Sequence, residues 1–136
     1  MSERAAQGSR VPEWFGAEEI DTIIVAFPDI HGRLLGKRMT RDFFLKHAAG
    51  SGIHVCNYLM AADLEMNPLD GFKVASWDRG FGDFHVKVDP GTLRRLPWQE
   101  GTAIVLGDLC HTGGAPVEES PRRVPVSYTH LRAHET

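Results

Sequence analysis

Clustered and alternating apolar residues predict short strands along most of the chain. An apolar strand is expected over residues 21–27 and a return strand over residues 33–40, with a turn from Pro28 to Gly32 between them. Pro28 fixes φ, Asp29 can bond its own backbone, and Gly32 permits a positive φ, as a hairpin turn requires. The pattern therefore begins with a β-hairpin.

A short helix is predicted after this hairpin. It covers residues 41–48, has Thr40 or Asp42 as its N-cap, and ends at the Gly50–Gly52 segment. Further strands are expected over residues 53–62, 83–88 and 102–109, with a turn and return over 90–97 and a hairpin tip at 113–114. This order predicts the α+β class, a mixed sheet with a short helix on one face.

A long irregular segment interrupts the strands over residues 63–82. It is rich in Asp, Asn, Gly and Pro. A loop of this length in a small domain is typically functional or contacts a partner. Functional residues are therefore expected in this segment.

Composition is that of an ordinary globular protein, with 42% hydrophobic and 24% charged residues in a chain of 136. This length suffices for one domain with its own core. The formal net charge of −3 gives no basic excess, so neither nucleic acid nor an anionic membrane is an expected partner. No apolar run approaches a membrane span, and residues 1–8 lack the apolar core of a signal peptide. A cytoplasmic location is therefore expected.

The cysteines and histidines indicate no metal site. Cys56 and Cys110 lie far apart in the sequence, and free buried thiols are the expected state in a cytoplasmic protein, although the sequence does not exclude a disulfide. Five histidines have no ligand spacing and are interpreted as structural or exposed: His31, His47, His54, His85 and His111.

Lys37 and Arg38 follow Gly36 on the return strand. A Gly-Lys pair without a glycine-rich loop and a following Ser or Thr is not a phosphate-binding loop. Cations on an edge strand discourage aggregation, and this is the favoured interpretation.

The C-terminal end departs from the preceding pattern. Ser120 and Pro121 predict the N-cap and first position of a helix, but residues 126–136 continue with neither a helical nor a strand period. This segment resembles the translation of a transposase adaptor used in DNA sequencing. We therefore expect a non-native tail, with a genuine polar tail as the alternative. His130 and His134 belong to this tail and are not interpreted as a helical metal pair.

Six segments between residues 19 and 123 occur in a characteristic order and spacing. They are Asp29-x-x-Gly32-x-x-x-Gly36-Lys37-Arg38, Cys56-Asn57-Tyr58-Leu59-Met60-Ala61-Ala62-Asp63, Ser76-Trp77-Asp78-Arg79-Gly80-Phe81-Gly82-Asp83, Val88-Asp89-Pro90-Gly91-Thr92-Leu93-Arg94-Arg95-Leu96-Pro97-Trp98, Gly107-Asp108-Leu109 and Ser120-Pro121-Arg122. The set resembles the N-terminal β-grasp domain of the glutamine synthetase family. No single segment is specific; the ordered set carries the resemblance.

The resemblance implies a domain organisation. Residues 1–18 are expected to be a flexible leader and residues 19–115 the β-grasp domain. Residues 116–125 would begin a truncated catalytic α/β domain, followed by the adaptor-like tail over 126–136. By the same resemblance, the intact parent forms a homo-oligomeric ring.

The resemblance also implies an activity for the intact parent. ATP phosphorylates the γ-carboxylate of glutamate, and an amine then attacks the γ-glutamyl phosphate, while Mg²⁺ or Mn²⁺ neutralises the phosphates. The ligands of ATP, metal and glutamate are expected in the C-terminal domain. The fragment alone is therefore expected to bind none of them and to be inactive.

Asp63 matches the family position of an acid that binds the amine and takes a proton in the active site of the adjacent subunit. A loop aspartate that caps the end of a strand is the structural alternative. Glu65 and Asp70 could bind a polyamine, with solvated loop charge as the favoured interpretation. Trp77 and Arg79 could form a subunit contact, and burial of Trp77 in the domain core is equally expected.

The residues after Asp63 bear on the substrate. Ammonia-using members of the family follow this aspartate with Gly-Ser-Ser, whereas Leu64-Glu65-Met66-Asn67 stands here. The departure weakens the case for ammonia but does not identify the amine. The Cys56-Asn57-Tyr58-Leu59 strand and the Ser76-Trp77-Asp78-Arg79-Gly80 loop resemble the branch that ligates glutamate to other amines, such as γ-glutamylpolyamine synthetases. Two alternatives stay open: glutamine synthesis from ammonia, and a stand-alone β-grasp module that binds a partner through residues 63–82.

Overall fold

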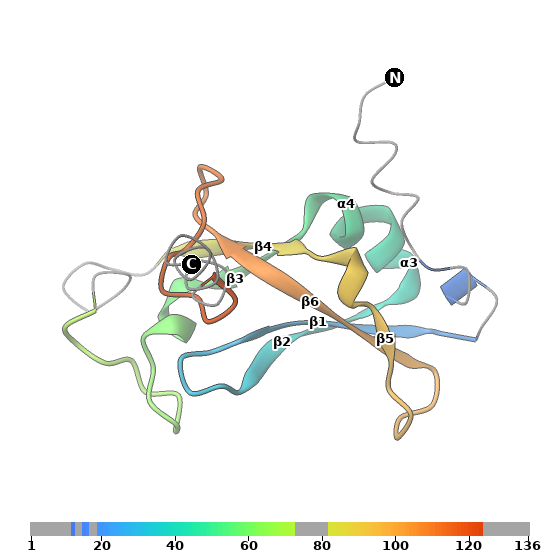
Figure 1. Cartoon of the computed structure of the whole chain (residues 1–136), viewed down its shortest axis with the longest axis horizontal. Coiled ribbons are helices and arrows are strands. Elements are labelled where there is room, and N and C mark those ends of the chain that lie inside the picture. Colours follow the sequence, from blue (N-terminus) through green and yellow to red (C-terminus); the bar gives the residue numbers. More distant parts are fainter. Residues whose placement is uncertain (1–11, 13–14, 17–18, 73–81, 124–136) are drawn as a thin grey trace, which may run out of the picture. The chain divides into compact units, whose positions relative to one another are not determined.

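The computed structural model describes residues 12, 15–16, 19–72 and 82–123, and every structural statement refers to these residues (Figure 1). The strands are β1 (Thr22–Pro28), β2 (Leu34–Thr40), β3 (Ile53–Cys56), β4 (Asp83–Val88), β5 (Arg94–Arg95) and β6 (Thr102–Cys110). The helical segments are α3 (Arg41–Phe43), η1 (Phe44–Ala48), α4 (Ala49–Ser51), η2 (Asn57–Met60) and η3 (Pro90–Thr92). None of these helices has the length and apolar character needed to cross a bilayer.

Hydrogen bonds join the strands in the order β2-β1-β6-β4-β3, and β5 pairs with β6. Strands β1 and β6 run parallel, with Thr22 opposite Thr102, whereas β5 runs antiparallel to β6, with Arg94 opposite Ile104. The sheet is therefore mixed, which confirms the predicted class of a mixed sheet with a short helix. Because β2 ends this order, Lys37 lies on an edge strand, as predicted.

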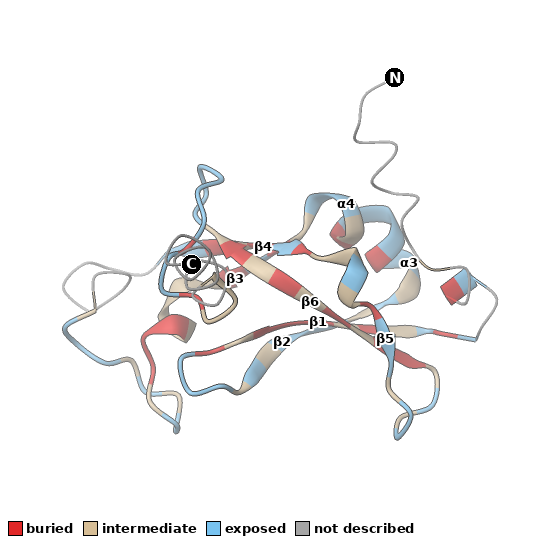
Figure 2. Cartoon of the chain, in the orientation of Figure 1, coloured by how far each residue is buried: buried red, intermediate tan, exposed pale blue. Residues whose placement is uncertain are grey.

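The chain divides into two compact units. Unit 1 comprises Met1–Ala26, Gly36–Ile53 and Lys87–Gly107, and unit 2 comprises Phe27–Leu35, His54–Val86 and Asp108–Thr136. Each unit has its own buried apolar side chains (Figure 2). Those of unit 1 include Phe15, Ile23, Val25, Phe44, Leu93 and Val105, and those of unit 2 include Phe27, Val55, Met60, Phe84, Val86 and Val117.

The helix of unit 1 runs from Arg41 to Ser51 in three consecutive stretches, three residues beyond its predicted end. The central stretch is a π-helical turn, whose Phe44 is buried. The helix extends past residue 48, but the predicted ending segment Gly50–Gly52 is confirmed, because Ser51 is the last residue of α4 and the chain leaves the helix at Gly52 with a φ of 72°.

Thr40 is the N-cap of this helix, which decides between the two predicted candidates. Its hydroxyl oxygen accepts a hydrogen bond of 3.2 Å from the Phe43 amide. Replacing Thr40 with alanine leaves that amide without its side-chain partner and is expected to cost about 1 kcal/mol of unfolding free energy, measured by urea denaturation. Thr40→Ser keeps the hydroxyl and is the matched control. Equal stability of the alanine and serine variants would contradict the capping role.

The predicted strand over residues 53–62 is too long. The strand ends at Cys56, and a 3-10 turn follows in which Met60 is buried and Tyr58 and Leu59 are only half-buried. Asn57 lies directly after the strand and is bonded to Gly82: its amide donates to the Gly82 carbonyl at 2.9 Å, and its side-chain oxygen accepts from the Gly82 amide at 3.1 Å. An apolar run does not itself show where a strand gives way to a turn.

Two other sequence predictions are confirmed in unit 2. Cys110 and Cys56 are free, as predicted, although they are half-buried and not buried as expected. The expected hairpin tip is closed by bonds from the His111 amide to the Ala115 carbonyl and from the Gly114 amide to the His111 carbonyl, both of 2.8 Å.

Only the beginning of the predicted helix at Ser120 falls within the described residues. The Arg123 amide donates to the Ser120 carbonyl at 2.8 Å, which forms a turn at the predicted place. The remainder of that helix and the expected tail over 126–136 lie outside the described residues.

Candidate functional site

The loop over residues 62–68 carries the main candidate, Asp63, and is closed on itself. Ala62 and Pro68 form a β-bridge at its base. The Asp63 amide donates to the Asn67 carbonyl at 2.9 Å, and the Met66 amide donates to the Asp63 carbonyl at 3.0 Å. The segment is thus a defined turn of unit 2 with a fixed backbone path.

The Asp63 carboxylate takes part in this turn. Its Oδ1 accepts hydrogen bonds of 2.9 Å from the Glu65 and Asn67 amides, and its Oδ2 accepts a longer one of 3.4 Å from the Asn67 side chain. The structural alternative foreseen for Asp63, a loop aspartate bonded to its own backbone, is therefore present. Since Oδ2 makes the weaker contact, it retains capacity to accept from a ligand.

These bonds hold the pKa of Asp63 below its ordinary value of 3.8. The Asn67 amide bond is the largest cause; desolvation opposes it, and the Asn67 side chain, the Glu65 amide and the charge of His31 add to the lowering. A carboxylate with a lowered pKa is fully ionised at neutral pH and a weak proton acceptor. Such a group is better suited to holding a cation than to removing a proton.

An ion pair between a buried carboxylate and a partly exposed guanidinium lies in the hairpin turn of the same unit. The side chain of Asp29 is 1% exposed, and its Oδ2 accepts from Arg33 Nε at 2.8 Å. Its Oδ1 accepts from the His31 and Arg33 amides, both at 2.9 Å, which confirms the predicted bond of Asp29 to its own backbone. Gly32 has a φ of 81°, as predicted for this turn.

The pKa of Asp29 lies below its ordinary value of 3.8. Desolvation by burial is the largest single influence and raises the pKa, but the hydrogen bonds and charge of Arg33 and the amide of His31 together outweigh it. Asp29 is therefore ionised while buried, which requires its cationic partner.

Arg33 connects this turn to the 62–68 loop. Its Nη1 donates to the Leu64 carbonyl at 2.6 Å, and its Nη2 lies 3.2 Å from both the Asp63 carbonyl oxygen and the Met66 sulfur. The two segments belong to one unit and lie side by side in Figure 1, where the hairpin turn is blue to cyan and the loop is green. Sequence reasoning missed this role of Arg33, although an arginine four residues after a turn aspartate was the available signal.

His31 adds a second bond between the turn and the loop. Its Nε2 lies 2.9 Å from the Ala62 carbonyl oxygen. Because a carbonyl accepts only, the imidazole must carry hydrogen on Nε2 and donate. The predicted interpretation of His31 as structural or exposed therefore holds, and its structural task is to hold the start of the loop.

Met66 has an unusual backbone conformation. Its φ of 68° is the only positive value at a non-glycine position among the described residues. The left-handed region costs a side-chain-bearing residue roughly 1–2 kcal/mol, so the surrounding bonds must impose it. The Arg33 contacts and the Asp63 turn supply such bonds.

The other predicted site residues contribute less to this geometry. Glu65 donates its amide to Asp63, and the Glu65 and Asp70 side chains are exposed, as expected for solvated loop charges. Trp77 and Arg79, the predicted interface residues, lie outside the described residues.

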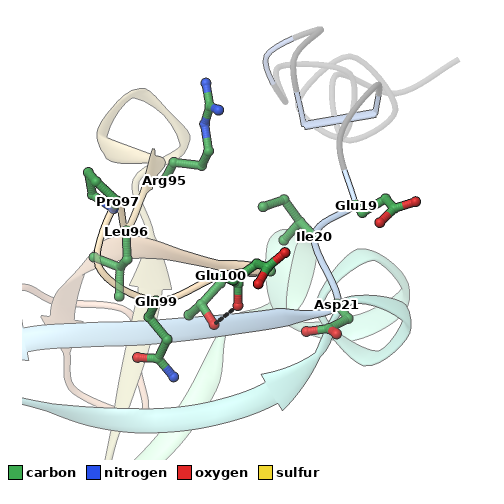
Figure 3. A pocket seen from close by; sticks show the side chains of 10 residues that line it. Glu19, Ile20, Asp21, Arg95, Leu96, Pro97, Gln99 and Glu100 are labelled. Atoms are coloured by element: carbon green, nitrogen blue, oxygen red, sulfur yellow. Dashed lines mark hydrogen bonds between the residues drawn. The ribbon is translucent and has the colours of Figure 1, made fainter.

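A cavity of about 880 Å³ lies in unit 1 (Figure 3). Its lining includes the carboxylates of Glu19, Asp21 and Glu100 and the side chains of Arg95 and Gln99. Nowhere in the described part of the chain are three or more His, Cys, Asp or Glu side chains grouped so that they could hold a metal ion.

Comparison with known proteins identifies the family. No family model matches the chain. It is 52% identical over 108 residues to γ-glutamylethanolamide synthetase GlnA4 of Streptomyces coelicolor, a match that covers 79% of this chain and 23% of that protein. It is 36% identical over 122 residues to a glutamate–isopropylamine ligase of Pseudomonas sp, covering 90% of this chain and 27% of that protein.

Solved structures show the same fold. A GmaS/ADP complex matches with a TM-score of 0.61 at 22% identity, covering 88% of this chain and 24% of that one. A glutamine synthase homolog matches with a TM-score of 0.60 at 17% identity, covering 76% of this chain and 24% of that one. The chain belongs to the glutamine synthetase family.

Within the glutamine synthetase family, both curated relatives are named for joining glutamate to an organic amine. The chain spans about a quarter of the length of these relatives, 23% and 27%. The family resemblance predicted from the ordered segments, including the branch that uses amines, is confirmed.

Proposed function

We propose that the chain is the N-terminal part of an ATP-dependent ligase that joins the γ-carboxylate of glutamate to an amine other than ammonia. The observation that carries the proposal is the 52% identity to a protein named γ-glutamylethanolamide synthetase. The match to a glutamate–isopropylamine ligase supports the same reaction class. Residues 19–115 would form the β-grasp domain of this parent, and residues from 116 onward would begin its catalytic domain.

Within that parent, Asp63 is proposed to bind the amine in the active site of an adjacent subunit of a ring. Its carboxylate is ionised, and Oδ2 has spare accepting capacity next to the fully occupied Oδ1. The lowered pKa favours electrostatic binding of an alkylammonium ion as its main contribution. Glu65 and Asp70 are then secondary charges that a longer, doubly charged amine could reach.

ATP, Mg²⁺ or Mn²⁺ and glutamate are proposed to bind to the remainder of the parent. Among the described residues, no group of three or more His, Cys, Asp or Glu side chains is arranged to hold a metal ion. This chain would supply the amine-binding loop and part of the subunit contact, and it would be inactive alone.

The amine is proposed to be a small primary monoamine or amino alcohol. The two curated relatives are named for ethanolamine and isopropylamine, neither of which is a polyamine. The test assays the intact parent with ATP, glutamate and a panel of amines, with the amide product identified by mass spectrometry. We expect γ-glutamyl amides of small amines to form faster than those of putrescine or spermidine, and faster than glutamine from ammonia.

Each other outcome of this panel has a defined meaning. If ammonia is preferred, the parent is a glutamine synthetase, and if polyamines are preferred, the branch assignment stands but the small-amine proposal does not. If no amide forms with any amine, the ligase proposal fails and a β-grasp module that binds a partner is the better description.

Replacing Asp63 with asparagine in the parent tests its role. Removing the negative charge is expected to raise the KM for the amine by about tenfold, equivalent to about 1.4 kcal/mol, while the KM for glutamate stays unchanged. Initial rates at varied amine and varied glutamate measure both constants. Asp83→Asn, which removes an exposed charge from the start of β4 in the same unit, is the matched control. An unaltered amine KM in the Asp63 variant would show that this carboxylate only caps its loop.

A further inference from the structure

The backbone path of the 62–68 loop depends on a cation from outside the loop. Three loop residues place an acceptor against the Arg33 guanidinium: the carbonyl oxygens of Asp63 and Leu64 and the sulfur of Met66. Carbonyl oxygens that converge in this way repel one another unless a group with several N–H donors lies between them. Arg33 supplies that donor, and the left-handed Met66 is held against it.

The Arg33 guanidinium is itself held in place by Asp29 of the hairpin turn. Its Nε is bonded at 2.8 Å to Asp29, whose carboxylate is buried and bonded to two backbone amides of the hairpin turn. The donors that point at the loop are therefore preorganised by a rigid turn and not by a mobile surface chain.

We propose that Arg33, held by Asp29, is a positioning residue that sets where the Asp63 carboxylate points and thereby sets the affinity of the ligase for its amine. The inference rests on the proposed function of Asp63. It assigns the control of amine binding to the hairpin turn, about 30 residues earlier in the chain.

Arg33 acts through the loop backbone and not on the amine. Its contacts with Asp63 and Leu64 are to their carbonyl oxygens, whereas the Asp63 carboxylate oxygens accept from Glu65 and Asn67. The positive charge thus orders the loop without forming an ion pair with the carboxylate, which stays available for an alkylammonium ion. A cation bound directly to that carboxylate would compete with the amine.

Only arginine fits this position. Arg33 donates from Nε to the Asp29 carboxylate and from Nη1 to the Leu64 carbonyl. Its Nη2 donates to the Asp63 carbonyl and the Met66 sulfur. A lysine ammonium is a single point charge on a flexible stem and cannot span these acceptors. Arg33→Lys therefore keeps the positive charge opposite Asp29 while removing the bonds from Nη1 and Nη2 to the loop.

The test uses the intact parent with Arg33→Lys and Arg33→Met. We expect the amine KM to rise about fivefold to tenfold in both, with kcat at saturating amine within about twofold and the glutamate KM unchanged. Combining Arg33→Lys with Asp63→Asn should add little to the effect of the Asp63 change alone, since both act through one carboxylate. Arg38→Ala, an exposed cation on the return strand, is the matched control and should leave all constants unchanged.

A second readout does not depend on catalysis. The Glu65 and Asn67 amides are bonded to the Asp63 carboxylate, so their hydrogen exchange in the parent reports whether the loop is formed. Exchange at these two amides should accelerate in the Arg33 variants and stay slow in Arg38→Ala.

Unchanged exchange and an unchanged amine KM in Arg33→Lys would overturn the inference. So would an equal rise of every KM or a fall in kcat alone, because these indicate general damage to the site. If the wild-type parent forms no γ-glutamyl amide, the proposed function fails, and the exchange measurement still decides whether Arg33 orders the loop. If Arg33→Met does not fold, Arg33→Lys carries the test, because it retains the ion pair.

Discussion

Replacing Gly36 with alanine is expected to remove most of the stability of the chain. Gly36 lies in the return strand of the hairpin, where a Cβ would overlap the Val25 carbonyl oxygen and lie 2.8 Å from Ala26 Cα. These are backbone atoms of β1, so no side chain can swing away to relieve the contact. Strands β1 and β2 would have to separate, and we expect a loss of about 3 kcal/mol or more, measured by urea unfolding.

Gly50→Ala is the matched control for this substitution. Gly50 lies in α4, and an added Cβ there meets nothing within 4 Å. Alanine is the better helix former, so this variant should gain up to about 1 kcal/mol. If both alanine variants unfold at the same urea concentration as the wild type, β1 and β2 do not pack as closely as described.

Replacing Asp29 with asparagine is expected to cost about 3 kcal/mol near neutral pH. The change leaves Arg33 without its counter-charge. It also places the asparagine side-chain amide where the Asp29 carboxylate accepted from Arg33 Nε, and loss of the buried member of an ion pair is costly. Asp83→Asn, on the exposed start of β4, removes one negative charge without a buried partner and should cost less than about 0.5 kcal/mol. Urea unfolding of the three proteins measures both differences.

The same pair predicts how stability depends on pH. The pKa of Asp29 is lower in the folded chain than its ordinary value of 3.8, so the unfolded chain binds the proton more readily. The stabilisation by Asp29 is therefore complete above pH 3.8 and is lost as the pH falls through the lowered pKa. The stability difference between wild type and Asp29→Asn should narrow in that acidic range, and a difference that stays constant would contradict the ion pair.

Local sequence signals predicted much of the fold. The hairpin, the strand over residues 83–88 and the N-cap at Thr40 all depend on neighbouring residues, and all three occur where they were expected. The ends of elements were less predictable. Strand β3 stops at Cys56, and the next residue, Asn57, bonds to Gly82; a contact between residues this far apart leaves no local pattern.

The candidate site likewise combines features that the local sequence predicts with features that depend on distant contacts. Asp63 was identified from the ordered family segments, and its position at the end of an apolar stretch was visible in the sequence. Arg33 was missed because its contacts with Leu64 and Met66 cross 31 and 33 positions of sequence. Only the fold brings the hairpin turn against the loop, so a single sequence gives no measure of that proximity.

The parallel pairing of β1 with β6 has a consequence for synthesis of the protein. Residues 22–26 leave the ribosome early, but their partners at 102–106 are made last among the described strands. The backbone N–H and C=O groups on one side of β1 therefore have no strand partner until β6 has been translated. A nascent chain stalled before residue 102 lacks the central strand of the sheet, and its unpaired β1 edge is expected to favour aggregation or binding by chaperones.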